Sequence, residues 1–251
     1  MLVHVLGPLR VTVDGEPVHL GGRRTKIVLA VLALEANWVV ALDRLVDAVW
    51  GSTPPASART QIRICVSSMR RAFAAAGAPE LIETHPSGYR LRLAESDLDA
   101  AVFEARVGHA RSLAGAGLAG EAVLELRRAL SLWTGPALAG LSGPGVDAGA
   151  RRLEEARLRA VEERVRLELD LGRHQDLIGE IMELAAAHPY REHLHAQLML
   201  ALYRSHRTAE ALAVYRRIRS TLVEELGIEP GPELSDLEQG ILLGMERVKL
   251  C

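Results

Sequence analysis

The side chains best suited to bind another molecule lie along residues 56–76, a segment with helical periodicity. Ile62, Val66, Met69 and Phe73 follow spacings of 4, 3 and 4, so they share one face of a helix. If that face is buried, the opposite face is polar and basic. Hydroxyl and guanidinium groups are the donors that proteins use toward base edges and phosphates, and an ordinary solvated helix surface is the alternative. The face and its flank comprise Ser57, Thr60, Ile64, Ser67, Ser68 and Arg71, with Arg59, Arg63 and Arg70 beside them.

The elements on either side favour nucleic-acid binding over a solvated surface. A short helix is predicted over 43–50, with Asp43 as its N-cap, and it stops at Gly51 before a proline-rich turn. Two short strands, 81–84 and 89–93, follow the long helix and are joined by residues 85–88. This order is that of a winged helix-turn-helix, whose second helix enters the major groove of DNA.

Two further groups of residues are predicted to complete the DNA-binding surface. Arg23, Arg24 and Thr25 stand at the start of a predicted first helix, 25–35, and are expected to hold phosphates together with Arg59 and Arg70. The wing residues His85, Ser87 and Arg90 are expected near phosphate or the minor groove. Gly88 is expected to supply a backbone conformation that few other residues tolerate.

No other constellation supports catalysis, a metal or a cofactor. His193 and His195 are two residues apart, so they lie on different faces of a helix, and His188 adds no ligand spacing. The glycines at 115–120 and 140–145 lie between helices, unlike a dinucleotide fingerprint, and the phosphate-loop and nucleophile-elbow motifs are absent. Cys65 is predicted to be a core residue. We therefore expect no enzyme, no metal and no cofactor.

Charge and cysteine content agree with a DNA-binding protein that also meets a protein partner. Residues 1–94 hold 11 Arg and Lys against 7 Asp and Glu, a net charge of +4, while residues 95–251 hold 19 against 25, a net charge of −6. The two cysteines, Cys65 and Cys251, lack metal-ligand spacing and predict a disulfide-free protein. No signal peptide or membrane span is recognised, so a cytoplasmic, nucleoid-associated protein is expected.

The remainder of the chain reads as helical. Three short strands are predicted at the N-terminus, over 2–6, 9–13 and 17–20, with a possible fourth at 39–40. Beyond residue 98 the apolar spacing predicts helices only, over 102–114, 119–133, 150–171, 175–187, 192–205 and 208–226. Residues 172–177 align with 206–211 at an offset of 34, the period of tetratricopeptide helix pairs, although His206 stands where glycine is usual.

The predicted fold is therefore an α+β N-terminal winged helix-turn-helix followed by an all-α, tetratricopeptide-like helical-repeat domain. The boundary is predicted at Ala94, which gives a DNA-binding domain over 1–94 and a helical domain over 95–251.

Almost the whole chain resembles the Streptomyces antibiotic regulatory protein family. The opening VHVLGPLRVTVDGEPVHLGGRRTKIVLAVLAL, the segment LDRLVDAVWGSTPPASARTQIRICVSSMRRAF and the segment ETHPSGYRLRL resemble its N-terminal sheet, helix-turn-helix and wing. The run MLALYRSHRTAEALAVYRRIRSTLVEELGIEPGPEL resembles its bacterial transcriptional activation domain. The sequence departs from the family pattern at Cys65 and Ser68, where polar or basic residues are often found.

The resemblance implies an OmpR-like winged helix without a receiver domain in front of it. It implies an activator that binds double-stranded promoter DNA at direct repeats near the −35 element, as a homodimer or side-by-side pair. It further implies contact with RNA polymerase holoenzyme through the sigma factor, and control of a secondary-metabolite cluster such as one for an antibiotic.

Other functions remain open from the residues alone. A repressor of the same fold, or a ligand-responsive regulator with a pocket in the helical domain, would have the same DNA-binding surface. A helical-repeat scaffold whose winged helix contacts protein would show no salt-dependent DNA binding.

Overall fold

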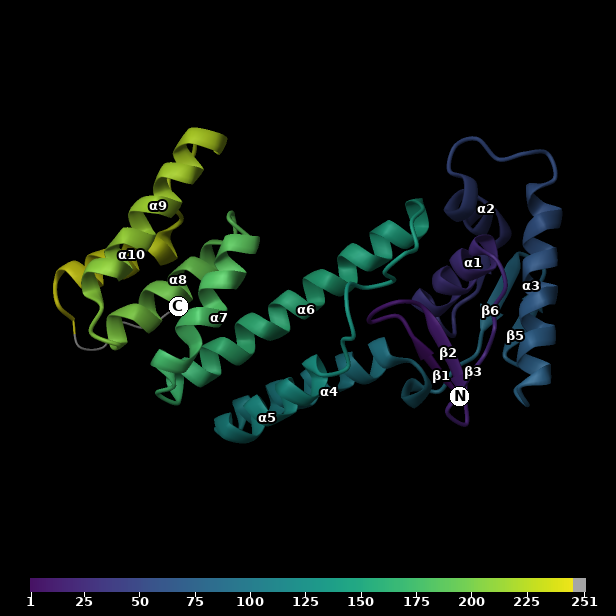
Figure 1. The fold of residues 1–251 in the computed structure, drawn as a ribbon, viewed down its shortest axis with the longest axis horizontal. Helices are drawn as coiled ribbons and strands as arrows, with labels where there is room; N and C mark the ends of the chain where they lie inside the picture. Colours follow the sequence, from purple (N-terminus) through teal and green to yellow (C-terminus); the bar gives the residue numbers. More distant parts are fainter. Residues whose placement is uncertain (246–251) are drawn as a thin grey trace. The chain divides into compact units, whose positions relative to one another are not determined.

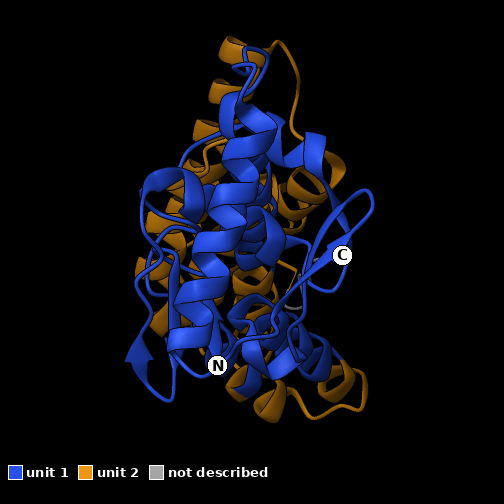
Figure 2. Cartoon of the chain, turned by 90° about the vertical axis from the view of Figure 1, so that its right-hand side faces the viewer, with its two compact units in different colours: residues 1–111, 125–159 blue, residues 112–124, 160–251 orange. Residues whose placement is uncertain are grey.

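The computed structural model describes residues 1–245, which form two compact units (Figure 2). The first unit contains residues 1–111 and 125–159, and the second contains residues 112–124 and, among those that the structure describes, 160–245. Cys251, for which neither a disulfide nor a metal was predicted, lies outside the described residues.

The first unit begins with a three-stranded antiparallel sheet in the order β1-β2-β3. The strands are Leu2–His4, Arg10–Val13 and Glu16–Pro17. Val13 pairs with Glu16, so only Asp14 and Gly15 form the turn, and both have positive φ (50° and 86°) as a two-residue hairpin turn requires. The predicted N-terminal sheet and its Asp-Gly turn are confirmed.

Three helices and a second sheet follow and make the winged helix (Figure 1). The helices are α1 (Arg23–Leu34), α2 (Leu42–Trp50) and α3 (Ala58–Ala75), and α3 packs along both of the others. The sheet has the order β4-β6-β5, formed by Val40–Ala41, Gly88–Leu91 and Ile82–His85. The predicted α+β winged helix-turn-helix is therefore present, and every element lies within a few residues of its predicted position.

The first unit also includes helical residues beyond the predicted boundary at Ala94. Asp99, at the start of α4 (Asp99–Gly115), accepts hydrogen bonds from the backbone N–H groups of Val5 (2.9 Å) and Leu6 (3.2 Å). Burial raises the pKa of the Asp99 carboxyl, against these hydrogen bonds, which favour its ionised form. Thr134 donates its backbone N–H to the Leu6 carbonyl at 2.8 Å. The buried backbone groups of Val5 and Leu6, directly after β1, therefore join the N-terminal sheet to segments that follow the winged helix.

Glycines seat the first turns of α6 (Pro144–Asp170) against α1 and α2. A Cβ atom at Gly145 would lie 2.8 Å from the Cβ of Ala48, and one at Gly149 would lie 2.2 Å from a methyl carbon of Leu34. Both separations are too short for carbon atoms. The Ala48 Cβ cannot move without its backbone, so a side chain at Gly145 would push the helices apart, whereas one at Gly149 would first displace the Leu34 side chain. The sequence predicts a break between helices at residues 143–145 and a helix from residue 150, whereas the helix begins at Pro144. Proline at a helix start loses no hydrogen bond.

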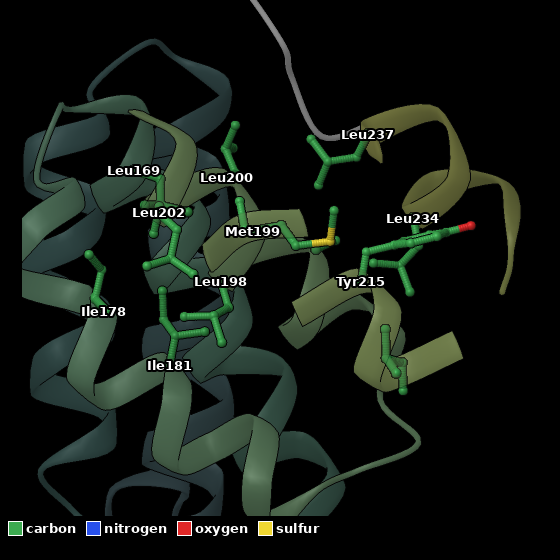
Figure 3. Close-up of a cluster of buried hydrophobic side chains, with 14 of the residues drawn as sticks. Leu169, Ile178, Ile181, Leu198, Met199, Leu200, Leu202, Tyr215, Leu234 and Leu237 are labelled. Atoms are coloured by element: carbon green, nitrogen blue, oxygen red, sulfur yellow. The ribbon is translucent and has the colours of Figure 1, made fainter. Parts of the chain in front are cut away.

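The second unit is entirely helical. Its complete helices are α7 (His174–Ala187), α8 (Glu192–Arg204), α9 (Thr208–Leu226) and α10 (Pro232–Leu242). In Figure 3, Leu198 and Leu202 of α8 extend towards Ile181 of α7, while Met199 extends towards the side of α10. Because α8 buries residues on nearly all its faces, it is the central helix of this core.

The turns that precede α7 and α9 each contain a residue with positive φ. Gly172 has φ of +85° and His206 has φ of +63°, both in the left-handed region. The helices that follow begin at His174 and Thr208, an offset of 34 residues. This agreement supports the predicted helical repeat and means that a histidine occupies a conformation that glycine adopts at lower cost.

Helix α10 was not predicted, although its signals are present. Pro232 starts the helix directly after Gly231, and Leu234, Leu237 and Ile241 are buried at helical spacing. Glu192 accepts a hydrogen bond from the Gly231 backbone N–H at 2.6 Å, which ties the α10 start to α8. None of the described helices combines the length and apolarity needed to cross a membrane.

Candidate nucleic-acid interface

Helix α3 has one buried and one exposed face, as its spacing predicts. Ile62, Val66, Met69 and Phe73 are all at most 2% exposed, and Cys65 is also buried, which confirms its assignment to the core. The opposite face is open to solvent except at Ser68, which is half-buried. Its exposed members are Ser57, Thr60, Arg63, Ile64, Ser67 and Arg71.

Arg63 and Arg71 are the α3 arginines that are available to a ligand. Among residues 1–245, no carboxylate or hydrogen-bond acceptor engages either guanidinium group, and both side chains are exposed. The helix itself carries no aspartate or glutamate. The exposed face therefore has a positive charge that nothing on the helix offsets.

The other two α3 arginines have partners within the protein. Arg59 forms an ion pair of 2.6 Å with Asp43 of α2, in which both side chains are mostly exposed. Arg70 donates to the Ile82 carbonyl (2.8 Å) and to the Thr84 hydroxyl (2.7 Å), so it holds β5 against α3. The predicted phosphate role of Arg70 therefore competes with a structural one.

The predicted N-cap role of Asp43 is wrong. Helix α2 begins one residue earlier than predicted, its N-cap is Ala41, and no side chain caps it. The backbone N–H of Leu42 donates to the Ser87 carbonyl, so the strand leads directly into the helix. Asp43 lies in the first turn, where a carboxylate still interacts favourably with the helix dipole, and it pairs with Arg59.

The start of α1 brings a second cationic group to the N-terminal end of α3. Arg24 donates to Gln61 Oε1 at 2.6 Å, and its guanidinium lies 5.5 Å from the centre of the Trp50 ring. Gln61 in turn donates to the Ser57 hydroxyl. These contacts hold Arg24 beside α3 with its charge uncompensated, because neither partner is acidic. Sequence reasoning missed both Trp50 and Gln61, which give no signal of this contact in the sequence.

The other two predicted residues at the start of α1, Arg23 and Thr25, differ in their exposure to solvent. Arg23 is exposed and donates to the Ser142 carbonyl and hydroxyl. Thr25 is only 8% exposed, so its side chain does not contribute to the surface. What Thr25 can still offer a phosphate is its backbone N–H, one of the first-turn groups that lack an intrahelical acceptor.

The wing contains an acidic residue that sequence reasoning missed. Glu83 accepts from Arg90 Nε at 2.8 Å and pairs with Arg92 at 3.0 Å, while His85 lies 3.8 Å away. The hydrogen bond from Arg90 is the main reason that the pKa of the Glu83 carboxyl lies below its ordinary value. The carboxylate therefore offsets part of the wing's positive charge. Ser87, at the tip, is exposed.

Gly88 is required at the wing for a reason other than the one predicted. Its φ is outside the positive range, but a Cβ atom there would lie 1.9 Å from the carbonyl oxygen of Val40. Strand β4 pairs with β6 at this point, Ala41 opposite Gly88, so any side chain would separate the two strands.

The histidines considered as metal ligands have other partners. His193 Nδ1 lies 3.0 Å from Glu233, and His195 Nε2 lies 3.2 Å from the Pro189 carbonyl. Over the part of the chain that the structure describes, no three His, Cys, Asp or Glu side chains gather as a metal site would require.

Comparisons with known proteins match both parts of the chain. Residues 15–91 match the family model described as the C-terminal part of transcriptional regulatory proteins, and residues 98–242 match that of the bacterial transcriptional activator domain. Regulatory protein DnrI of Streptomyces peucetius is 37% identical over 96% of this chain and 92% of its own length. Regulatory protein AfsR of Streptomyces coelicolor is 41% identical over 95% of this chain, but the match spans only 24% of that longer protein.

A solved structure has the same fold over nearly the whole chain. It is Mycobacterium tuberculosis EmbR in complex with a low affinity phosphopeptide, with a TM-score of 0.94 and 36% sequence identity. The match covers 98% of this chain and 66% of that chain. DnrI, AfsR and EmbR are all named as regulatory proteins. With its winged helix, exposed basic α3 face and adjoining all-helical domain, the chain belongs to the Streptomyces antibiotic regulatory protein family of DNA-binding transcriptional regulators.

Proposed function

We propose that this protein is a sequence-specific transcriptional activator of a biosynthetic gene cluster for a secondary metabolite, in particular an antibiotic. Two copies bind side by side to direct repeats in double-stranded promoter DNA near the −35 element, and they recruit RNA polymerase holoenzyme through its sigma factor. The single observation that carries the DNA-binding part is the exposed face of α3, which presents Arg63 and Arg71 on a helix without acidic residues.

The width of an α-helix supports placing α3 in the major groove. A helix with its side chains is about 10–12 Å across, and the major groove of B-DNA is about 12 Å wide. In that groove Thr60, Arg63, Ile64, Ser67 and Arg71 face the base edges. Arginine is suited to paired hydrogen bonds with guanine, and hydroxyls donate to or accept from several bases.

Phosphate binding is assigned to the start of α1 and to the wing. Arg24 is exposed at the α1 N-terminus, where free backbone N–H groups and the helix dipole favour an anion. The secondary contacts are Arg23, Arg59, Arg70, His85, Ser87 and Arg90, because all but Ser87 lie beside partners within the protein. On DNA, Arg59 can exchange Asp43 for a phosphate, since an exposed ion pair contributes little, about 0–1 kcal/mol.

Activation, rather than repression, is supported by the match of residues 98–242 to the bacterial transcriptional activator domain. An all-helical domain with a buried core has no inherent chemistry but offers surfaces to protein partners. We assign the contact with RNA polymerase to this domain and DNA reading to the winged helix.

The test is a selection on sheared DNA from the source genome, with bound fragments sequenced at two salt concentrations. Enrichment of direct repeats just upstream of promoters is expected, and it would identify the operon. The variant R63A/R71A should lose this enrichment. The single variants R63A and R10A form the matched pair, because R10A removes the same charge from an exposed residue of β2. Recovery of random fragments only, lost together at higher salt, would contradict sequence-specific binding.

In vitro transcription from a selected fragment then separates activator from repressor. With housekeeping RNA polymerase holoenzyme, an activator raises the transcript yield, and the R63A/R71A variant abolishes that increase. A lower yield with the wild-type protein would identify a repressor, and an effect only after addition of a metabolite would identify a ligand-responsive regulator.

A further inference from the structure

Ile64 is the one large apolar side chain that α3 exposes, and it lies at the centre of the proposed DNA-reading face. It is 61% exposed, whereas Ile62, Val66 and Met69 are at most 2% exposed. Thr60, Ser67 and Arg71 lie four residues before it and three and seven after it, so they share its face. The sequence prediction placed Ile64 on this face without giving it a chemical role.

Nothing in the fold explains isoleucine at this position. A β-branched residue is a less favourable helix former than the long polar residues that usually occupy solvent-facing positions. A single exposed apolar residue is ordinary on a protein surface, but this one lies among the polar and basic residues of the proposed DNA-reading face. On DNA, its partner would be an apolar group that is found among phosphates and base edges.

We propose that Ile64 recognises a thymine by packing its side chain against the C5-methyl group in the major groove. This inference rests on the proposed function, because it requires α3 to enter that groove. Among the groups that the four base pairs present there, the thymine methyl is the apolar one, while the others are hydrogen-bond donors and acceptors. Arg63 and Arg71 then contact neighbouring bases or phosphates, and Ile64 makes the apolar contact that hydrogen-bonding side chains cannot make.

The same contact selects against cytosine. Cytosine lacks the methyl group and presents the N4 amino donor at the corresponding edge. At the position of the methyl group cytosine carries only a hydrogen atom, so the apolar contact with Ile64 is lost there.

The test removes the methyl group from the DNA without changing anything else. Full-length protein is used to select tight-binding duplexes from a random-sequence library, and each thymine of the best duplex is replaced in turn by deoxyuridine. One thymine per bound copy is expected to be sensitive, with binding weakened about fourfold, the equivalent of burying one methyl-sized group. In the variant I64A the same replacement should weaken binding less than twofold, because the partner of the methyl group is gone.

A second replacement separates the methyl group from the rest of the base. At the sensitive position, 5-methylcytosine should bind the wild-type protein more tightly than cytosine, and I64A should show no such preference. The thermal midpoint of I64A should match that of the wild type, since the side chain is exposed. The variant S67A serves as the matched control, because it truncates an exposed neighbour on the same face and should keep the deoxyuridine sensitivity.

The outcomes distinguish the two proposals. Selection of a defined sequence with no position whose methyl sensitivity depends on Ile64 would overturn this inference and leave sequence-specific DNA binding intact. Failure to select any sequence would overturn both. Equal methyl sensitivity in the wild type and I64A would assign the methyl contact to another side chain.

Discussion

Arginines on the proposed DNA-binding surface fall into two groups according to what their guanidinium groups contact. Arg63 and Arg71 are exposed, and no acceptor among residues 1–245 engages them. Arg59 and Arg90 are paired with carboxylates, and Arg70 is bound to β5. The first group can meet DNA without losing an interaction, so substitutions there should have the larger effect on binding.

Substitutions of Arg71 and Arg24 should affect binding in different ways. R71A removes a predicted base contact and should cost about 1–3 kcal/mol on a selected site but less on random DNA. R24A removes a predicted phosphate contact, so it should weaken both DNAs alike and lower the salt slope by about 0.9 per phosphate. Titrations of both DNAs at several salt concentrations measure this. If both variants lost the same affinity on every sequence, Arg71 would not differ from Arg24 in contacting bases instead of phosphates.

Replacing Glu83 should strengthen binding. In E83Q the side chain no longer offsets the charges of Arg90 and Arg92, so affinity for random DNA should rise several-fold, with a steeper dependence on salt. The control is E80Q, which removes the same charge from an exposed glutamate outside the wing cluster. An equal gain from E80Q would mean that only net charge matters.

His206 should be replaceable by glycine with a gain in stability. It is exposed and has φ of +63°, a conformation in which a side chain costs about 1–2 kcal/mol, partly offset by the greater freedom of glycine in the unfolded chain. H206G should therefore unfold at a higher urea concentration, because its free energy of unfolding should rise by roughly 0.5 kcal/mol. The reciprocal change G172H, at the equivalent turn with φ of +85°, should destabilise by about 1 kcal/mol.

At the scale of elements, the position of α6 depends on the absence of side chains. Gly145 and Gly149 allow its first turns to approach α1 and α2 closely enough for Ala48 and Leu34 to make contact. A helix with ordinary side chains at these positions would stand further away, because helix axes separate with the size of the residues between them.

The variant G145A tests this contact. Its new methyl group would lie 2.8 Å from the Ala48 Cβ, so the two helices must shift, at a cost of about 1–3 kcal/mol. The control is G179A on α7, where a Cβ meets nothing within 4 Å and alanine should stabilise the helix by up to about 1 kcal/mol. Urea unfolding of both variants measures the difference in sign. Two stabilised variants would show that α6 does not depend on the glycine.

At the scale of the whole molecule, the winged helix is not packed as an independent body. Its N-terminal residues Val5 and Leu6 are almost fully buried, and their backbone groups are hydrogen-bonded to Asp99, Thr134 and Leu138. The compact unit that contains them extends to residue 159 and includes segments assigned to the helical domain. We therefore propose 1–94 as a functional division of the chain, which need not be a folding unit.

Truncation tests this distinction. A fragment of residues 1–94 should be less stable than one of residues 1–159 by about 3 kcal/mol or more, since at least two apolar side chains lose their cover. Circular dichroism during urea unfolding of both fragments and the full chain measures it. Equal midpoints for the two fragments would make 1–94 an autonomous folding domain.

Local signals in the sequence predicted the helix-turn-helix and the wing. The spacing of Ile62, Val66, Met69 and Phe73 set the buried face of α3, and the exposed face then followed from helix geometry alone. Turn residues such as Asp14 and Gly15 marked the hairpins, because few other residues adopt positive φ. The helix at 232–242 was missed although its proline start and apolar spacing were present.

The sequence by itself determined which residues could bind DNA, because residue type and periodicity are local properties of the chain. Only the tertiary structure decided which of them are available. Arg70 is held by β5, Arg90 by Glu83 and Arg23 by Ser142, and Thr25 is buried beneath the surface. Those partners lie up to 119 residues away along the chain, and neither periodicity nor composition carries information about contacts at that separation.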